Sequence, residues 1–253
     1  MNIKQQQTRV WCVAPKNIPL LAQQVHVWRV PLEKAELMEL GPSLLQLLSK
    51  EEFERGSRLI KSVLRQRFWM AHVVLRLILA NYTGEEAKAL RFHTGEYGKP
   101  YLTDSTIQFN LSHAHDQMLL AVAKDIEVGV DIEYMRPIEV EELAGRFFSP
   151  SEVSSLHGLT PAERKLGFYR LWSRKEAFIK AIGKGLSYPL HDFSVSLENT
   201  QDNCLLAIEG NAEQAKEWSL LGLGEVDDYV MAVAYQGKDY GLYCGIVAIE
   251  DLL

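Results

Sequence analysis

The chain has 253 residues and a formal net charge of −6, with 47% hydrophobic and 24% charged residues. These proportions are typical of a globular protein that forms one large domain or two of ordinary size. The negative charge argues against nucleic-acid binding, and no apolar run approaches the roughly 20 residues that a membrane-spanning helix needs.

The cysteines and the N-terminus indicate where the protein works. The three cysteines lie far apart without metal-ligand spacing, and their odd number fits a reducing compartment better than a disulfide scaffold. The N-terminal stretch lacks the basic start, apolar core and cleavage site of a secretory signal. We therefore expect a cytoplasmic protein that does not enter a membrane.

Strands and helices alternate in the first half of the chain. Residues 1–20 contain two prolines and predict a loosely attached arm. Alternating apolar side chains predict strands at 25–30, 107–113 and 118–124, the last two joined as a hairpin. Apolar side chains at helical spacing predict helices at 33–48, interrupted at Gly41, and at 50–81, with a break near Gly56. Ser49 is a favourable N-cap for the second of these helices.

The predicted helix at 50–81 carries an excess of positive charge. No acidic residue occurs between Arg55 and Gly84. The basic residues in this stretch are Arg55, Arg58, Lys61, Arg65, Arg67 and Arg76. They indicate either a positive field suited to an anion such as phosphate or a solvated face whose acidic partners lie elsewhere.

The second half begins with a strand at 127–133 and continues with helices and further strands. A short helix is expected at 139–147, after Arg136-Pro137. Capping patterns predict further helices from Ser149 and from Thr160 to about residue 182, where Gly183 ends the last one. Apolar runs predict strands at 193–197, 204–209, 218–223, 229–235 and 242–249. Both halves thus run from a strand to a long helix and then to paired strands. We expect an α+β fold of two similar halves, residues 1–126 and 127–253, with a ligand cleft near residue 127.

Two carboxylates lie on one face of the strand at 127–133. Asp131 and Glu133 are two residues apart, so their side chains share a face, while Val128, Val130 and Ile132 point the other way. The pattern is typical either of a solvated edge or of a Mg²⁺ site that also uses substrate phosphate. Glu176, on the later helix, adds a third carboxylate, or else forms a surface ion pair with Lys180.

Several stretches together resemble the 4′-phosphopantetheinyl transferases of the surfactin-synthetase-activating type. They occur in the family's order, over roughly residues 48–197. The matching stretches are residues 96–100 (EYGKP), 109–113 (FNLSH), 129–133 (GVDIE), 146–149 (RFFS), 172–180 (WSRKEAFIK) and 183–186 (GKGL).

The resemblance implies a pseudo-twofold α+β protein with coenzyme A in the cleft between its halves. The implied reaction moves the 4′-phosphopantetheine arm of coenzyme A to a serine of an acyl or peptidyl carrier protein and releases adenosine 3′,5′-bisphosphate. Such carriers serve fatty-acid, polyketide and nonribosomal peptide synthesis, and the sequence does not select among them. Because a single chain supplies both halves, we expect a monomer.

The resemblance also assigns roles to residues. Asp131 and Glu133 match Mg²⁺-binding carboxylates, and Glu176 matches a third that acts as metal ligand, general base or both. Lys175 and Lys180 match lysines near the pyrophosphate. The implied coenzyme A contacts are Lys99, Ser112, His113, Arg67 and Arg55. Glu52 stands where the family carries a lysine, so we expect the pocket for the 3′-phosphate to be built differently.

Two other functions share these features. A carrier-binding module without catalysis would use the same surface, although a pure binder has no need to hold three carboxylates together. A Mg²⁺-dependent nucleotide hydrolase would also use carboxylates and basic residues. It would consume coenzyme A without a protein acceptor, which distinguishes it from a transferase.

Overall fold

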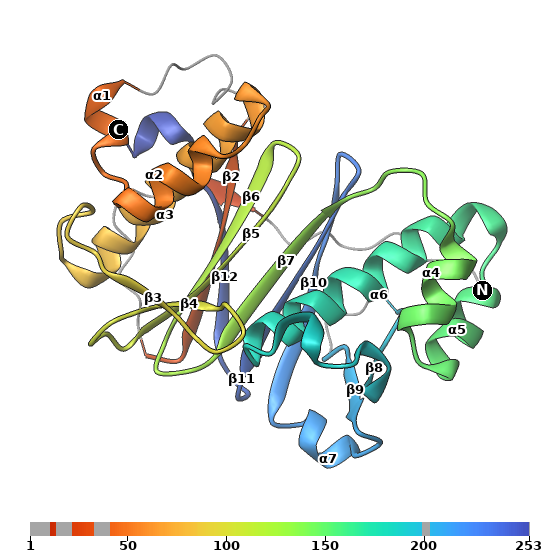
Figure 1. Ribbon diagram of the computed structural model, residues 1–253. Coiled ribbons are helices and arrows are strands. Elements are labelled where there is room, and N and C mark those ends of the chain that lie inside the picture. The colour runs from red at the N-terminus through yellow and green to blue at the C-terminus, as the bar shows by residue number, and fades with distance from the viewer. Residues whose placement is uncertain (1–10, 14–21, 33–40, 199–202, 253) are drawn as a thin grey trace.

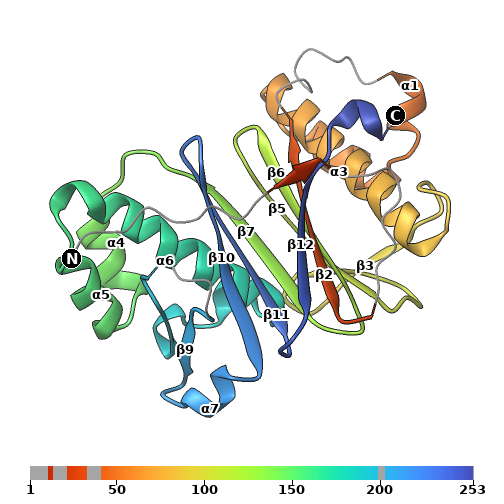
Figure 2. The same cartoon turned by 180° about the vertical axis from the view of Figure 1, so that it is seen from behind.

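The structure is a computed structural model that describes residues 11–13, 22–32, 41–198 and 203–252. It is a mixed helix and sheet protein in which two sheets lie back to back, with a long helix on the outer side of each (Figure 1). Seen from behind, strands of the two sheets lie side by side and the helices occupy the outer flanks (Figure 2). Within the described residues, no helix is both long and apolar enough to cross a membrane.

The first sheet is covered by helix α3. The sheet has the order β1-β12-β2-β6-β5. Its strands are β1 (Cys12–Val13), β12 (Gly241–Ile246), β2 (Gln24–Pro31), β6 (Gln117–Lys124) and β5 (Ile107–Ala114). Apolar side chains of α3 (Ser62–Thr83), such as Met70 and Val74, pack on Phe109 and Leu120 of the sheet. The smaller elements here are α1 (Pro42–Leu45), α2 (Lys50–Ser57), β3 (Phe92–Thr94), β4 (Pro100–Leu102) and a 3-10 turn at Ile249–Asp251.

The second sheet is covered by helix α6. Its antiparallel strands, in spatial order, are β10 (Trp218–Val226), β11 (Tyr229–Gln236) and β7 (Val128–Tyr134). Phe178 and Ile179 of α6 (Pro161–Ala181) share a core with Ala232 and Ala234 of β11. The remaining elements are α4 (Val140–Phe147), α5 (Pro150–His157), 3-10 turns at Gly185–Ser187 and Leu190–Asp192, β8 (Phe193–Val195), β9 (Leu205–Ile208) and α7 (Ala212–Ala215).

A third core joins the two sheets and fixes the faces of β7. Val128, Val130 and Ile132 lie in this core with Val27 of β2 and Leu119 of β6. The predicted division of the strand is therefore confirmed, because these three residues turn away from α6. The alternate residues of β7, which are Gly129, Asp131 and Glu133, consequently face α6.

The capping patterns read from the sequence are confirmed. Ser49 and Ser149 each form a capping box with the glutamate three residues later, and Thr160 does so with Glu163. The expected break near Gly56 also occurs, since α2 ends at Ser57 and α3 begins at Ser62. At Gly56 the two helices touch, because a Cβ there would lie 2.2 Å from Nε1 of Trp69.

Two expectations for the beginning of the chain have different outcomes. The arm predicted over residues 1–20 is wrong for Cys12 and Val13, which form a parallel strand with Gly245 and Ile246 of β12. Pairing with β12 thus attaches this part of the chain at the edge of the first sheet. Of the helix predicted at 33–48, residues 33–40 lie outside the described residues, and Pro42–Leu45 form a single short helix.

Candidate active site

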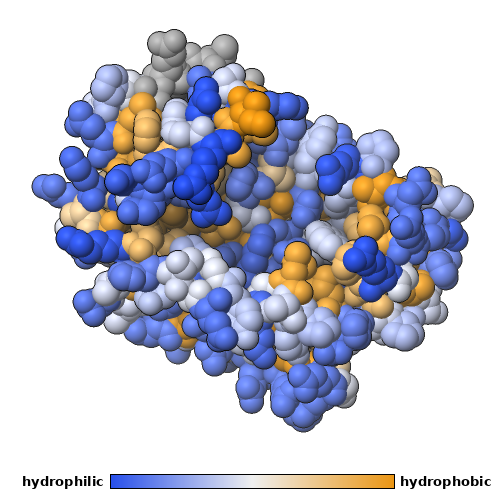
Figure 3. Space-filling model, in the orientation of Figure 1, coloured by the Kyte–Doolittle hydropathy of each residue, from blue (hydrophilic) through white to orange (hydrophobic). Residues whose placement is uncertain are grey.

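Three polar side chains from β5, β7 and α6 meet at the edge between the two sheets. Lys180 donates to Oδ1 of Asp131 at 2.6 Å and to the hydroxyl of Ser112 at 3.0 Å. Ser112 in turn donates to Oδ1 of Asp131 at 3.1 Å and accepts from the backbone N–H of Ile132. Figure 3 shows the surface of this side hollowed between the helices of the two sheets, with hydrophilic residues in the hollow.

A close approach of helix and strand brings these residues together. Gly129 of β7 faces the backbone of α6, where a Cβ would lie 2.2 Å from the carbonyl oxygen of Ala177 and 2.3 Å from the nitrogen of Ala181. Asp131 is the next residue on the same face of the strand. The glycine therefore allows the last turns of α6 to lie directly over β7, which places Lys180 beside Asp131.

The carboxylates of the site carry more negative charge than their partners compensate. Burial and the nearby Asp131 raise the pKa of Glu133 to about 7 and that of Glu176 to about 7. Burial alone would lower the pKa of Lys180, but Asp131, Glu176 and Glu133 outweigh it and raise that pKa above its ordinary value. One lysine thus faces three acids, an arrangement that favours binding of a further cation.

One oxygen of Asp131 is available to a cation. Its side chain is 2% exposed, and Oδ2 is buried without a hydrogen-bond partner. A buried carboxylate oxygen without a donor is costly, so such an atom commonly binds a metal ion or an ordered water. The other oxygen is held by Lys180 and Ser112, which leaves Oδ2 as the free ligand atom.

The residues present fit Mg²⁺ better than a metal held by protein ligands alone. Among the described residues, no group of three histidine, cysteine, aspartate or glutamate side chains is arranged as a metal-binding set. Mg²⁺ commonly takes one or two carboxylates and completes its shell with water and substrate phosphate. Asp131 and Glu133 offer such a pair, and Nε1 of Trp172 orients Glu133 by donating to its Oε1 at 3.0 Å.

Two of the predicted phosphate contacts, His113 of β5 and Arg55 of α2, lie in the same region as Lys180. Loss of water around its ring and the nearby His72, Lys180 and Arg55 lower the pKa of His113 below its ordinary value. Arg55 also lies over the ring of Phe68, 5.8 Å from its centre, and Phe68 stacks on His72. His113 therefore lies near two cations, Arg55 and Lys180. Arg67 lies half-buried on α3.

Two predicted coenzyme A contacts have their polar groups committed within the protein. The hydroxyl of Ser112 donates to Asp131 and accepts from Lys180 and the N–H of Ile132, which exhausts its capacity. It therefore positions Asp131 and Lys180 instead of holding a phosphate through its side chain. Lys99 donates to Oε2 of Glu127 at 2.6 Å and to the carbonyl of Ala181 at 2.8 Å.

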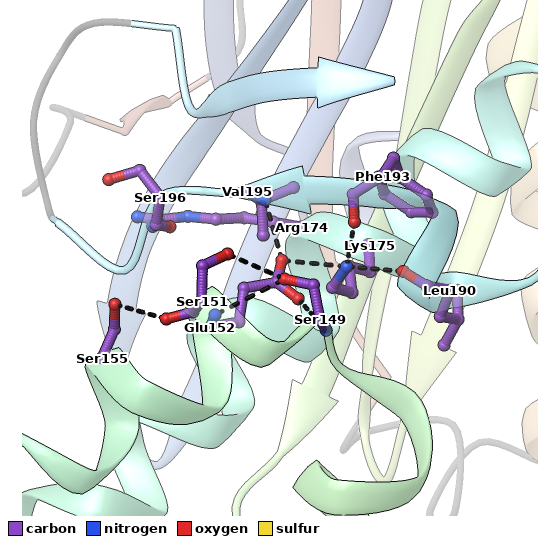
Figure 4. A network of polar contacts seen from close by, with 10 residues as sticks. All are labelled: Ser149, Ser151, Glu152, Ser155, Arg174, Lys175, Leu190, Phe193, Val195 and Ser196. Carbon is purple, nitrogen blue, oxygen red and sulfur yellow. Dashed lines mark hydrogen bonds and ion pairs between the residues drawn. The ribbon is translucent and has the colours of Figure 1, made fainter. Parts of the chain in front are cut away.

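Lys175 does not reach the site, contrary to the role that the resemblance implied. It is 0% exposed, and its ammonium contacts Glu152 at 2.9 Å and donates to the carbonyls of Leu190 and Phe193 at 2.7 and 2.6 Å (Figure 4). All three N–H groups are used, so none remains for a pyrophosphate. Lys175 instead ties α6 to α5 and to the segment before β8.

The structure explains Glu52 and identifies residues that no motif marked. Glu52 completes the capping box of Ser49 at the start of α2, and its Oε2 forms an ion pair with Nε of the buried Arg76 at 2.8 Å. Glu52 is thus a structural partner of one arginine of α3. Sequence reasoning gave no role to Trp172 as the partner of Glu133 or to His72 beside His113. For Trp172 the sequence did contain a signal for a place near the site, because Trp172 lies one turn from Glu176 on the same helix face.

Curated proteins of one family are similar to nearly the whole chain. A family profile described as the 4′-phosphopantetheinyl transferase superfamily matches residues 127–234. The 4′-phosphopantetheinyl transferase HetI of Nostoc sp. is 37% identical over 234 residues, which cover 90% of this chain and 94% of HetI. The 4′-phosphopantetheinyl transferase Sfp of Bacillus subtilis is 33% identical over 229 residues, which cover 90% of this chain and 99% of Sfp. The similarity therefore extends over both sheets.

A solved structure was also found to be similar to part of the chain. It is the crystal structure of a holo-(acyl-carrier-protein) synthase from Bacillus anthracis in complex with CoA (3′,5′-ADP). Its TM-score is 0.36 at 20% sequence identity, and the match covers 45% of this chain and 98% of that one.

Proposed function

Because the chain belongs to the 4′-phosphopantetheinyl transferase superfamily, we propose that the site around Asp131 and Lys180 performs that family's reaction. The protein is a transferase that moves the 4′-phosphopantetheine arm of coenzyme A to a serine of an apo carrier protein. The observation that carries the assignment to this site is the buried Asp131, which pairs with Lys180 through one oxygen and lacks a partner on the other.

Asp131 and Glu133 are the proposed ligands of Mg²⁺, with Glu176 as a third carboxylate beside them. Mg²⁺ held there would supply positive charge to the pyrophosphate oxygens of coenzyme A. Asp131 is held in place by Ser112, and Glu133 by Trp172. Both ligands are therefore preorganised before substrate binds.

Glu176 is the proposed general base. The serine hydroxyl of the carrier attacks the phosphorus that bears the pantetheine arm, a new O–P bond forms, and the bond to the bridging oxygen breaks. The hydroxyl proton passes to Glu176, and adenosine 3′,5′-bisphosphate leaves. A base works best with a pKa close to the operating pH, which fits the raised pKa of about 7 for Glu176.

Basic residues on both sides of the hollow are proposed to bind the phosphates of coenzyme A. Lys180 lies beside Asp131 and is placed to stabilise the leaving bisphosphate. The first sheet and its helices provide Arg55 on α2, Arg67 on α3 and His113 on β5. Arg55 and Arg67 belong to the stretch without acidic residues that begins at Arg55. Arg55, Arg67 and Lys180 would supply positive charge to the phosphates, and His113, whose pKa is lowered, would donate a hydrogen bond as a neutral ring.

We further propose that residues 1–126 and 127–253 are two similar halves of a pseudo-twofold monomer, with coenzyme A between them; β12, from the second half, crosses over to pair with β2 in the first sheet. Two observations support this proposal. The strand orders β5-β6-β2 and β10-β11-β7 correspond, and each set is covered by a long helix, α3 or α6.

The three free cysteines agree with a cytoplasmic location.

Intact-protein mass spectrometry of an apo acyl carrier protein tests the function. The carrier is incubated with this protein, coenzyme A and Mg²⁺. We expect its mass to rise by about 340 Da, the mass of the phosphopantetheine arm, as the serine becomes the acceptor in phosphoryl transfer. Adding EDTA should abolish the gain, and excess Mg²⁺ should restore it.

The same experiment separates the competing functions. An unchanged mass for both an acyl and a peptidyl carrier would contradict the transferase and leave a carrier-binding module. Loss of coenzyme A without a labelled carrier would indicate a nucleotide hydrolase. A gain that persists in EDTA would retain the transferase and contradict the proposed Mg²⁺ site.

A further inference from the structure

A side chain of the first half of the chain caps the helix that carries the proposed base. Lys99, in the connection between β3 and β4, donates to the carbonyl of Ala181 at 2.8 Å. Ala181 is the last residue of α6. The final carbonyls of an α-helix have no partner within the helix, and the helix dipole favours a cation beside them. Lys99 therefore stabilises the end of the helix on which Glu176 and Lys180 lie.

The same ammonium is held from a third segment. Oε2 of Glu127, the residue before β7, lies 2.6 Å from Nζ of Lys99. The side chain of Lys99 is 15% exposed and that of Glu127 49%. Burial lowers the pKa of Lys99, and Glu127 opposes this effect. One mostly buried cation thus joins the β3–β4 hairpin, the start of β7 and the end of α6.

The backbone around Lys99 is shaped to deliver its side chain to this place. Gly95 donates to the carbonyl of Lys99 at 2.9 Å, and Gly98 donates to that of Gly95 at 3.0 Å. Gly98 has a φ of +88°, which a residue with a side chain adopts only with strain. The methylenes of Lys99 then lie over Gly183, where a Cβ would be 3.4 Å from Cδ. The hairpin and the end of α6 therefore fit each other closely.

We propose that Lys99 and Glu127 form a clasp that holds the β3–β4 hairpin on the end of α6. In this proposal Lys99 is a positioning residue whose ammonium acts through α6 and not on a phosphate of coenzyme A. Two of its three N–H groups are committed to protein acceptors, and the carboxylate of Glu127 beside it repels a phosphate. The proposal rests on the proposed function and changes the role that the family resemblance gives to Lys99.

Hydrogen exchange measured by mass spectrometry tests the clasp without using activity. The full-length protein is compared with Lys99→Met and Glu127→Gln, and with Lys124→Met, which removes an exposed lysine from the end of β6. We expect both clasp variants to exchange amides of residues 92–102 about fivefold faster, with α3 unchanged. Lys124→Met should match the parent protein. Unchanged exchange in Glu127→Gln would overturn the clasp.

Kinetics of carrier modification test the positioning role. We expect Lys99→Met and Glu127→Gln to lower kcat by a similar factor, about fivefold, with KM for coenzyme A within about twofold of the parent value. The double variant should be no worse than Lys99→Met, because both changes open the same clasp. Lys99→Arg keeps a cation that can donate to both Glu127 and Ala181, so it should recover most of kcat.

A direct contact to coenzyme A would give a different result. Lys99→Met would then raise KM for coenzyme A about tenfold while Glu127→Gln left it unchanged or lowered it, and this outcome would overturn the positioning role. Failure of the parent protein to modify any carrier would overturn the proposed function. The exchange result would still decide the clasp in that case.

Discussion

Lys180 and Asp131 form an ion pair in which Nζ and Oδ1 are 2.6 Å apart, while the second oxygen of the same carboxylate is buried without a donor. A fully compensated structural ion pair would satisfy both oxygens. This second oxygen distinguishes Asp131 from Glu152, the other acid that is buried among the described residues, because both oxygens of Glu152 accept hydrogen bonds. Oδ2 of Asp131 is where Mg²⁺ is proposed to bind.

Replacing Glu176 by glutamine should slow transfer without preventing binding. Glutamine keeps the shape of the side chain but cannot accept the serine proton, so we expect kcat to fall by about 100-fold or more. Binding of adenosine 3′,5′-bisphosphate, measured by calorimetry, should change little. Glu142→Gln removes an exposed acid on α4 and should leave kcat unchanged. Parent-like turnover by Glu176→Gln would remove it from the mechanism.

Gly129→Ala should destabilise the protein, because the added methyl group would meet the backbone of α6 at 2.2 Å. Backbone atoms cannot rotate away, so we expect a loss of about 3 kcal/mol in the free energy of unfolding by urea. Gly145→Ala is the matched control, since a Cβ there meets nothing within 4 Å and alanine favours a helix. Equal urea midpoints for the two variants would show that α6 does not lie against β7 as described.

The two lysines Lys175 and Lys50 should differ in their contribution to stability. Lys175→Met leaves Glu152 charged and buried at 2% exposure, so we expect a loss of about 3 to 5 kcal/mol in the free energy of unfolding. Lys50→Met breaks an exposed pair with Glu54, and a loss below about 1 kcal/mol is expected. Urea denaturation of both variants measures the difference. A small effect at Lys175 would contradict the buried network of Figure 4.

The contribution of His26 to stability should decrease in mild acid, because His26 is buried in a network that needs it neutral. Nε1 of Trp28 donates to the hydroxyl of Tyr82, so that hydroxyl donates to Nδ1 of His26, whose Nε2 donates to Gln24. Burial lowers the pKa of His26 from 6.5 to about 4. Between these two values the unfolded chain binds more protons than the folded protein.

The contribution of His26 is therefore complete above about pH 6.5 and is lost as the pH falls toward 4, by up to about 3 kcal/mol. Glu133 and Glu176 act in the opposite direction over this range, because their pKa values are raised to about 7. The test is therefore the difference in urea midpoint between the parent protein and His26→Phe, measured from pH 7.5 to 4.5, which should shift by this amount as the pH falls. The difference between the parent protein and His157→Gln, at an exposed position, should stay constant. A constant difference for His26→Phe would contradict the assignment.

Local patterns determined the elements and the residue types of the site. Ser49, Ser149 and Thr160 mark helix starts because a capping hydroxyl acts on amides only three residues away. The face of β7 that carries Asp131 and Glu133 was likewise predicted from alternation, since successive strand side chains point to opposite sides. The family motifs added the order of these pieces along the chain.

Only the tertiary structure decided which lysine lies at the proposed site. Lys175 and Lys180 lie on one helix that is buried on most sides, so no exposed face distinguishes them in the sequence. Packing of Gly129 against α6 directs Lys180 to Asp131, while Lys175 meets Glu152. The partners of Lys99 were equally hidden, because Ala181 is 82 residues away in the sequence. Contacts over such separations depend on how the sheets and helices pack, which no local pattern encodes.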